Sequence, residues 1–230
     1  MERVRSLGVA GFAAAGIVFV GMSSGGAEAS IVRARATADN HYAIFTLMDA
    51  TLGYVGGNET GAEGSSGGYN WSEAEWWEFE SDSYVYVAAW SDKSIAQGLL
   101  IDLEVDGEMI LSGDPRWQVA STGTPRTTGD PHPLALDVEG FADAASRGGG
   151  WETPFVGGTN GIAPWASIAS ISSESRWMWR NVAGDDNPLD GGADAGEMLL
   201  FRIPVTIPSP GSHACLLAGA MLLSARRRAG

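Results

Sequence analysis

The strongest strand signal in the chain lies between Ser83 and Trp90, where Tyr, Val, Ala and Trp follow one another without a break. Aromatic and β-branched residues favour strands, and the polar residues on both sides of this run mark its ends. The surrounding segment, residues 69–105, also contains Trp71, Trp76 and Trp77. We expect this segment to form the centre of a packed sheet, although so many aromatic residues could also form a sugar-binding face.

Further short strands are predicted on both sides of this centre. Residues 31–37 alternate between polar and apolar side chains, and residues 41–48 follow an Asp39-Asn40 turn. The remaining predicted strands are residues 76–80, which would pair with 84–90, then 98–105, 109–111 after an Asp106-Gly107 hairpin turn, 116–120, 175–179 and 197–205. The sequence therefore predicts an all-β fold, an antiparallel β-sandwich over residues 30–205.

Residues 121–150 are rich in Pro, Gly and Thr and show little periodicity. A loop of this length in a compact domain usually has a role of its own. Within it, residues 134–145 could form either a short strand or a helical turn.

The N-terminal residues 1–29 have the three parts of a secretory signal peptide. Arg3 and Arg5 supply the positive charge, residues 7–20 are mostly apolar, and Ala27 and Ala29 fit the small-residue cleavage pattern. We expect a signal helix that signal peptidase removes, so that the body is exported. An uncleaved anchor is the alternative, but the apolar run is short beside the ~20 residues that a membrane-spanning helix needs.

The C-terminal residues 206–230 have a different three-part arrangement. An extended proline motif comes first, an apolar segment at residues 213–225 follows, and a cluster of arginines ends the chain. The apolar segment predicts a short transmembrane helix, and the arginines would remain on the cytoplasmic side of the membrane. The residues of the motif and the cluster are Pro208, Ser209, Pro210, Arg226, Arg227 and Arg228.

This tail resembles the PEP-CTERM sorting signal that exosortase enzymes recognise. The usual central motif is Val-Pro-Glu-Pro, whereas this chain has Ser209 in place of the glutamate. The resemblance implies processing by an exosortase-like enzyme and transient anchoring in the membrane. A plain C-terminal anchor is the alternative.

The body resembles the galactose-binding-like jelly-roll modules attached to rhamnosidases and other surface glycoproteins. The stretches that carry this resemblance are residues 38–45, 84–89, 96–100, the strand at Trp117, 163–165 and 177–179. In such modules the strand after the Asp-Asn turn pairs with a strand like residues 84–90. The family often has an Asn-Gly hairpin next, where this chain has residues 49–57. Ligand contacts vary among these modules, so the resemblance assigns no contact residue.

The composition restricts the partners of the chain. There are 28 Asp and Glu residues against 14 Lys and Arg, and the formal net charge is −14. Such a surface repels phosphate backbones, so we expect no nucleic-acid partner. The single cysteine, Cys215, lies in the tail, which excludes an intrachain disulfide and a cysteine metal cluster.

Several tryptophans are candidates for carbohydrate contact, because exposed aromatic rings can stack on sugars. Trp71, Trp151 and Trp165 lie among residues typical of loops. Trp76 and Trp77 are neighbours in one predicted strand, so their side chains must point to opposite faces and one of them should lie outside. Core packing is the alternative for each of these residues.

Acidic residues suggest two further kinds of site. Asp39, Glu73, Glu75, Glu78 and Glu80 lie near aromatic residues, as the acids of glycosidases do, but in so acidic a chain a solvated face is the simpler interpretation. Asp185, Asp186, Asn187 and Asp190 supply oxygen ligands of the kind that calcium prefers, without the spacing of an EF-hand. A structural calcium ion and a solvated loop remain the alternatives there.

Together these features predict an exported, non-catalytic β-sandwich protein of the cell envelope or extracellular matrix, processed at both ends, with polysaccharide as its expected ligand. Two alternatives stay open: a secreted enzyme that acts on glycans, and a purely structural or adhesive surface protein.

Overall fold

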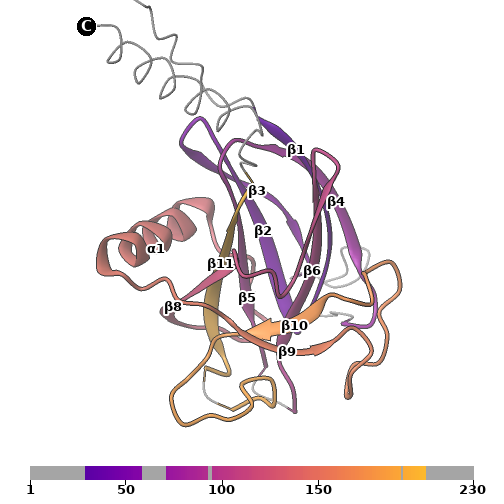
Figure 1. The fold of residues 1–230 in the computed structure, drawn as a ribbon. Coiled ribbons are helices and arrows are strands. Elements are labelled where there is room, and N and C mark those ends of the chain that lie inside the picture. The colour runs from indigo at the N-terminus through magenta and orange to yellow at the C-terminus, as the bar shows by residue number, and fades with distance from the viewer. Residues whose placement is uncertain (1–28, 59–70, 93–94, 193, 206–230) are drawn as a thin grey trace, which may run out of the picture.

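The computed structural model describes residues 29–58, 71–92, 95–192 and 194–205 of the 230-residue chain. They form two antiparallel sheets that face each other and one helix that lies against the outside of one sheet (Figure 1). The predicted sorting motif and membrane helix lie outside the described residues, as do the predicted signal peptide and cleavage site except for Ala29. In the part of the chain that is described, no helix is both long enough and apolar enough to cross a membrane.

All the strands of the described residues belong to these two sheets. The first sheet has the order β4 (Glu75–Ser81), β1 (Ser30–Asp39), β6 (Gly98–Val105), β10 (Arg176–Trp179) and β9 (Phe155–Thr159), and β7 (Glu108–Leu111) also pairs with β6. The second has the order β3 (Thr51–Gly57), β2 (His41–Met48), β5 (Tyr84–Trp90), β11 (Glu197–Pro204) and β8 (Gln118–Pro125). The prediction of two packed antiparallel sheets is confirmed.

Strand β5 is apolar without a break because both of its faces are buried. Val85 and Val87 belong to the core between the two sheets, whereas Tyr86 and Trp90 belong to a second apolar cluster beneath the helix α1 (Ala135–Gly148). Figure 1 shows this helix beside the sheet that contains β5 and β11. The strand predicted as the centre of the fold is therefore the middle strand of a sheet that is covered on both sides.

The helix is the main departure from an all-β fold. It has 14 residues, begins in the segment 134–145 that the sequence left between a strand and a helical turn, and continues three residues beyond it. It ends at Gly149 with a left-handed φ of 68°. Only Val138 and Ala142 are fully buried, one turn apart, so the apolar stripe is narrow and alanine-rich. Such a stripe gives little periodic signal, which explains why the helix was not predicted.

The strand pairing also corrects one prediction and confirms two. Strands β4 and β5 do not pair with each other: β4 pairs with β1 in the first sheet, and the chain crosses to the second sheet between Ser81 and Tyr84. Strand β2 does pair with β5, from His41 opposite Trp90 to Thr46 opposite Val85. The hairpin between β6 and β7 forms at Asp106 and Gly107, which both have positive φ.

Strand β9 and most of β3 were not predicted, because both are rich in glycine. Gly56 of β3 shows why the residue is needed there: a Cβ atom at this position would lie 2.1 Å from the ring of Trp77. Because the tryptophan ring lies so close to the backbone, only glycine fits at this position, and glycine gives no strand signal in the sequence.

Candidate functional site

The candidate site lies at the end of the sandwich where the chain passes from β1 to β2. Asp39 is the last residue of β1, and Asn40 connects it to β2. A cavity of about 250 Å³ opens at this crossing. Its lining consists of Asp39, Asn40, Trp71, Asp92, Ile95, Ala96, Pro164 and Trp165.

Asp39 is a buried acid of this cavity with a raised pKa. Its side chain is only 8% exposed, and its two carboxylate oxygens accept hydrogen bonds of 2.7 Å from Asn40 Nδ2 and from Trp165 Nε1. Burial raises the pKa of Asp39 to about 6, the bond from Trp165 acts in the opposite direction, and the nearby charge of Asp92 raises the pKa further. A carboxyl group with such a pKa changes its charge close to neutral pH.

Asn40 fixes the shape of the cavity wall. Its Oδ1 accepts a hydrogen bond of 2.5 Å from the backbone N–H of Asp92, and its carbonyl oxygen accepts one of 2.9 Å from Asn58 Nδ2. Asn58 in turn accepts a bond of 2.7 Å from the backbone N–H of Tyr42. The ends of β1, β2, β3 and β5 are thereby tied together around the two carboxylates of the cavity.

Trp165 lies in a loop, as predicted, and its ring is buried, which is the core-packing alternative that the sequence left open. The side chain is 2% exposed, and its ring stacks on Trp177 with 4.1 Å between the ring centroids. The loop can bury an indole because its own polar groups are satisfied. Asn160 Nδ2 donates to the carbonyls of Ile168 and Ile171 at 2.9 and 3.0 Å.

Asp102 holds the far end of the same loop. This buried carboxylate of β6 accepts a hydrogen bond of 2.6 Å from the backbone N–H of Ser172 and another from the hydroxyl of Ser175. Neither Asn160 nor Asp102 was identified from the sequence. The sequence offered one signal for Asp102, which is its position within the apolar strand of residues 98–105. A carboxylate buried in such a strand needs hydrogen-bond partners, which indicates a role for it.

A second cavity of about 480 Å³ continues from the first. The two share Ile95, Ala96, Pro164 and Trp165 as their common wall, so we call them together the loop groove. The second cavity is mostly apolar, with Asn187 and Asp190 as its polar lining. Its further lining residues are Phe155, Gly157, Gly158, Ile162, Ala163 and Leu189.

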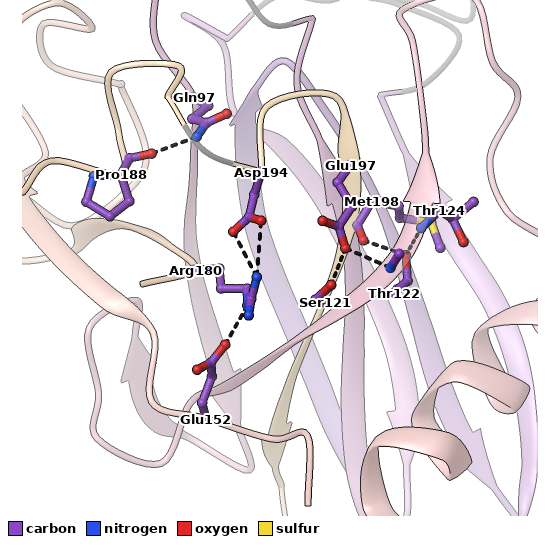
Figure 2. Close-up of polar contacts among 11 residues, drawn as sticks. Gln97, Ser121, Thr122, Thr124, Glu152, Arg180, Pro188, Asp194, Glu197 and Met198 are labelled. Carbon is purple, nitrogen blue, oxygen red and sulfur yellow. Dashed lines mark hydrogen bonds and ion pairs between the residues drawn. The ribbon is translucent and has the colours of Figure 1, made fainter. Parts of the chain in front are cut away.

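The segment that carries Asn187 and Asp190 is held in place by polar contacts, several of which are visible in Figure 2. Gln97 Nε2 donates a bond of 2.7 Å to the carbonyl of Pro188. Arg180 forms ion pairs with Glu152 at 2.5 Å and with Asp194 at 3.1 Å. The bond to Pro188 connects the 187–190 segment, which contributes to the lining of the second cavity, to the body of the sandwich.

Of the predicted aromatic candidates, Trp71 lines the first cavity and Trp165 lines both. Trp76 is 54% exposed and carries the guanidinium of Arg35 at 4.4 Å from its ring, whereas the half-buried Trp77 packs against the core. The prediction that these neighbours point to opposite faces is confirmed.

Trp151 lies elsewhere, in the apolar cluster beneath α1. The guanidinium of Arg202 lies 3.9 Å from the centre of its ring, and its Nε1 donates to the Ser146 hydroxyl at 3.1 Å. The structure thus brings Trp71 and Trp165 together at one site and leaves Trp76, Trp77 and Trp151 outside it.

The acidic candidates are similarly divided. Glu78 forms an ion pair with Arg33 at 2.7 Å, and Glu75 accepts a bond of 2.5 Å from the Tyr42 hydroxyl, so these two acids do not converge on one cavity. Asp39 does line a cavity together with Asp92, a residue that the sequence did not single out.

The predicted calcium ligands are only partly brought together. Asp185 Oδ1 accepts the backbone N–H of Asn187 at 3.0 Å, and Asn187 and Asp190 line the second cavity. Within the described ranges no three Asp, Glu, His or Cys side chains are placed to hold one metal ion. A calcium ion at Asp185, Asp186, Asn187 and Asp190 therefore stays a prediction.

Comparisons of the chain with protein-family models, with curated proteins and with solved structures gave no match.

Proposed function

We propose that this chain is an exported, non-catalytic protein that binds carbohydrate in the loop groove. The observation that carries the proposal is the joint lining of one cavity by an aromatic residue, an amide residue and two acids: Trp71, Asn40, Asp39 and Asp92. An aromatic ring gives a sugar an apolar surface, and fixed carboxylate and amide groups bind its hydroxyls.

The location of the protein belongs to the same proposal. The features of residues 1–29 and 206–230 support export, cleavage by signal peptidase, and sorting by an exosortase-like enzyme to the cell envelope or extracellular matrix. A jelly-roll of the galactose-binding-like kind is the finer fold that we propose for the body. Two features support it: the pairing of β2 with β5, and the repeated crossing of the chain between the two sheets.

A glycan array probed with residues 29–205 tests the binding. We expect signals on a restricted set of polysaccharides, and the variant Trp71→Ala should weaken or lose them because it removes one of the two tryptophans that line the first cavity. Trp76→Ala is the matched control, because Trp76 lies on a strand outside the groove. An array without signal for the unmodified segment would instead support a purely structural or adhesive role.

An enzyme that acts on glycans is the second candidate, and one observation favours it. Asp39 has a raised pKa and shares its cavity with Asp92, a combination that general acids use. Release of reducing ends from a bound polysaccharide, abolished in Asp39→Asn, would establish this function. Unchanged turnover in that variant, or no turnover of any bound glycan, would reject it.

A further inference from the structure

We propose that the carbohydrate bound in the loop groove carries free amino groups, as in a polymer with 2-amino-2-deoxyhexose units. The inference deepens the proposed function and rests on it. The inference is based on three acidic residues that line one groove. The rest of the lining is mostly aromatic and apolar, and no basic residue is among the described residues that line it.

The first step concerns the distribution of charge. Asp39 and Asp92 line the first cavity, and Asp190 lines the second, on the other side of the shared wall. Arg176 bonds to the carbonyl of Gly157 but lines neither cavity. With a formal net charge of −14 on the whole chain, an anionic sugar would be repelled from this groove and a cationic one attracted to it.

The second step concerns the carboxylate of Asp39 itself. Each of its oxygens accepts one hydrogen bond from a neutral donor, Asn40 Nδ2 or Trp165 Nε1. A carboxylate oxygen can accept a second bond, so the group keeps acceptor capacity. Neutral donors alone do not compensate a buried charge, whereas an ammonium group would supply both a donor and the opposite charge.

The third step concerns the rest of the ligand. The common wall of the two cavities is formed by Ile95, Ala96, Pro164 and Trp165, and Trp71 lies on the first cavity only. Such a lining suits the apolar face of a sugar ring and offers few donors for hydroxyl groups. A chain of amino sugars would place rings against this wall and ammonium groups near the carboxylates at both ends.

Titration calorimetry on the full chain with two oligosaccharides of equal length tests this inference. The probes are the β-1,4-linked tetramer of glucosamine and the corresponding tetramer of N-acetylglucosamine, at neutral pH and low salt. We expect the glucosamine tetramer to bind about tenfold or more tightly, because a charge-assisted hydrogen bond to a carboxylate is lost on acetylation. Addition of 0.5 M NaCl, a concentration at which surface charges are strongly screened, should reduce the ratio of the two affinities.

Two variants identify the responsible groups. Asp92→Asn and Asp39→Asn should each weaken the binding of the glucosamine tetramer by a larger factor than that of the N-acetylated tetramer, because only the first loses a charge-assisted hydrogen bond. Asp92→Asn is included because Asp39 also holds Trp165, so its replacement could disturb folding. Glu78→Gln is the matched control, because it removes one acid from the ion pair with Arg33 on the strand β4.

Three other results would contradict the inference, and each of them points to a different conclusion about the groove. Equal affinities for the two tetramers would overturn the amino-sugar inference and leave carbohydrate binding intact. Equally tight binding of a tetralysine peptide would show a site for cationic peptides instead. Failure of both tetramers to bind overturns the inference, and a glycan array without signal would then overturn the proposed function as well.

Discussion

The indole Nε1 of Trp165 donates a hydrogen bond of 2.7 Å to Oδ2 of Asp39 across 126 residues of sequence. Both groups are buried, and the ring of Trp165 also stacks on Trp177 of β10. The bond therefore joins the crossing between the two sheets to the loop that forms the shared wall of the groove. The conformation of the loop and the charge of Asp39 depend on each other through this one contact.

Replacement of Trp165 by phenylalanine should separate the two roles. The ring can still stack, but the Asp39 carboxylate loses a donor that lowers its pKa, so the pKa should rise above its value of about 6. We expect a loss of about 1–3 kcal/mol in the free energy of unfolding at pH 7.5, measured by urea denaturation. At pH 4, where Asp39 is mostly protonated in the folded state, the loss should be smaller. Equal losses at both pH values would contradict this account.

Asp39 and His41 should give stability opposite dependences on pH. Burial raises the pKa of Asp39 from 3.8 to about 6, so its contribution is fully present below pH ~4 and is lost as the pH rises through 6. Burial lowers the pKa of His41 from 6.5 to about 4, so its contribution is present above pH ~6.5 and is lost as the pH falls through 4. Between pH 4 and 6 the two contributions change in opposite directions and largely cancel.

Single variants should expose each contribution. When the pH is lowered from 6 to 4, Asp39→Asn lacks the stabilisation that the unmodified chain gains. Its free energy of unfolding should therefore fall relative to that of the unmodified chain, by on the order of 2 kcal/mol. In His41→Phe, which keeps a ring to stack on Trp90, it should rise over the same interval. Thermal or urea denaturation at several pH values measures both differences. Parallel profiles for the variants and the unmodified chain would show that neither group titrates differently in the folded state.

The sequence predicted the parts of the fold that depend on local pattern. The strands at residues 84–90 and 98–105 and the Asp106-Gly107 hairpin are apolar runs or turns with a standard local signal. The partner of β4 could not be predicted, because strand pairing depends on contacts far apart in sequence.

The candidate site was predictable only in part for the same reason. Trp71 and Trp165 were identified as aromatic candidates, but nothing local indicated that Trp165 would be buried against Trp177 and bonded to Asp39. Asp92 gave no signal at all, because its role arises from the approach of β5 to the crossing at Asn40. Long-range hydrogen bonds of buried side chains leave no periodic trace in a sequence.

The hairpin between β2 and β3 contains an unfavourable turn residue that can be improved. Met48 pairs with Thr51, and the two turn residues between them, Asp49 and Ala50, have φ values of 49° and 60°. Alanine at positive φ costs roughly 1 kcal/mol relative to glycine. We therefore expect Ala50→Gly to raise the free energy of unfolding by up to about 1 kcal/mol in urea denaturation. Ala145→Gly, in the helix α1, is the matched control and should lower it by a similar amount.

The neighbours Trp76 and Trp77 should respond very differently to truncation. Trp77 packs against the core, donates a bond of 3.0 Å to the Tyr42 hydroxyl and lies over Gly56, so Trp77→Ala leaves a cavity and removes one hydrogen bond. We expect it to lower the free energy of unfolding by about 2–4 kcal/mol.

Trp76→Ala removes an exposed ring and its contact with Arg35, and should cost less than about 1 kcal/mol. Urea denaturation of the two variants under the same conditions measures the difference. Similar losses for both would mean that β4 does not present alternate faces to solvent and core. A large loss for Trp76→Ala alone would place that ring, rather than Trp77, against the core of the sandwich.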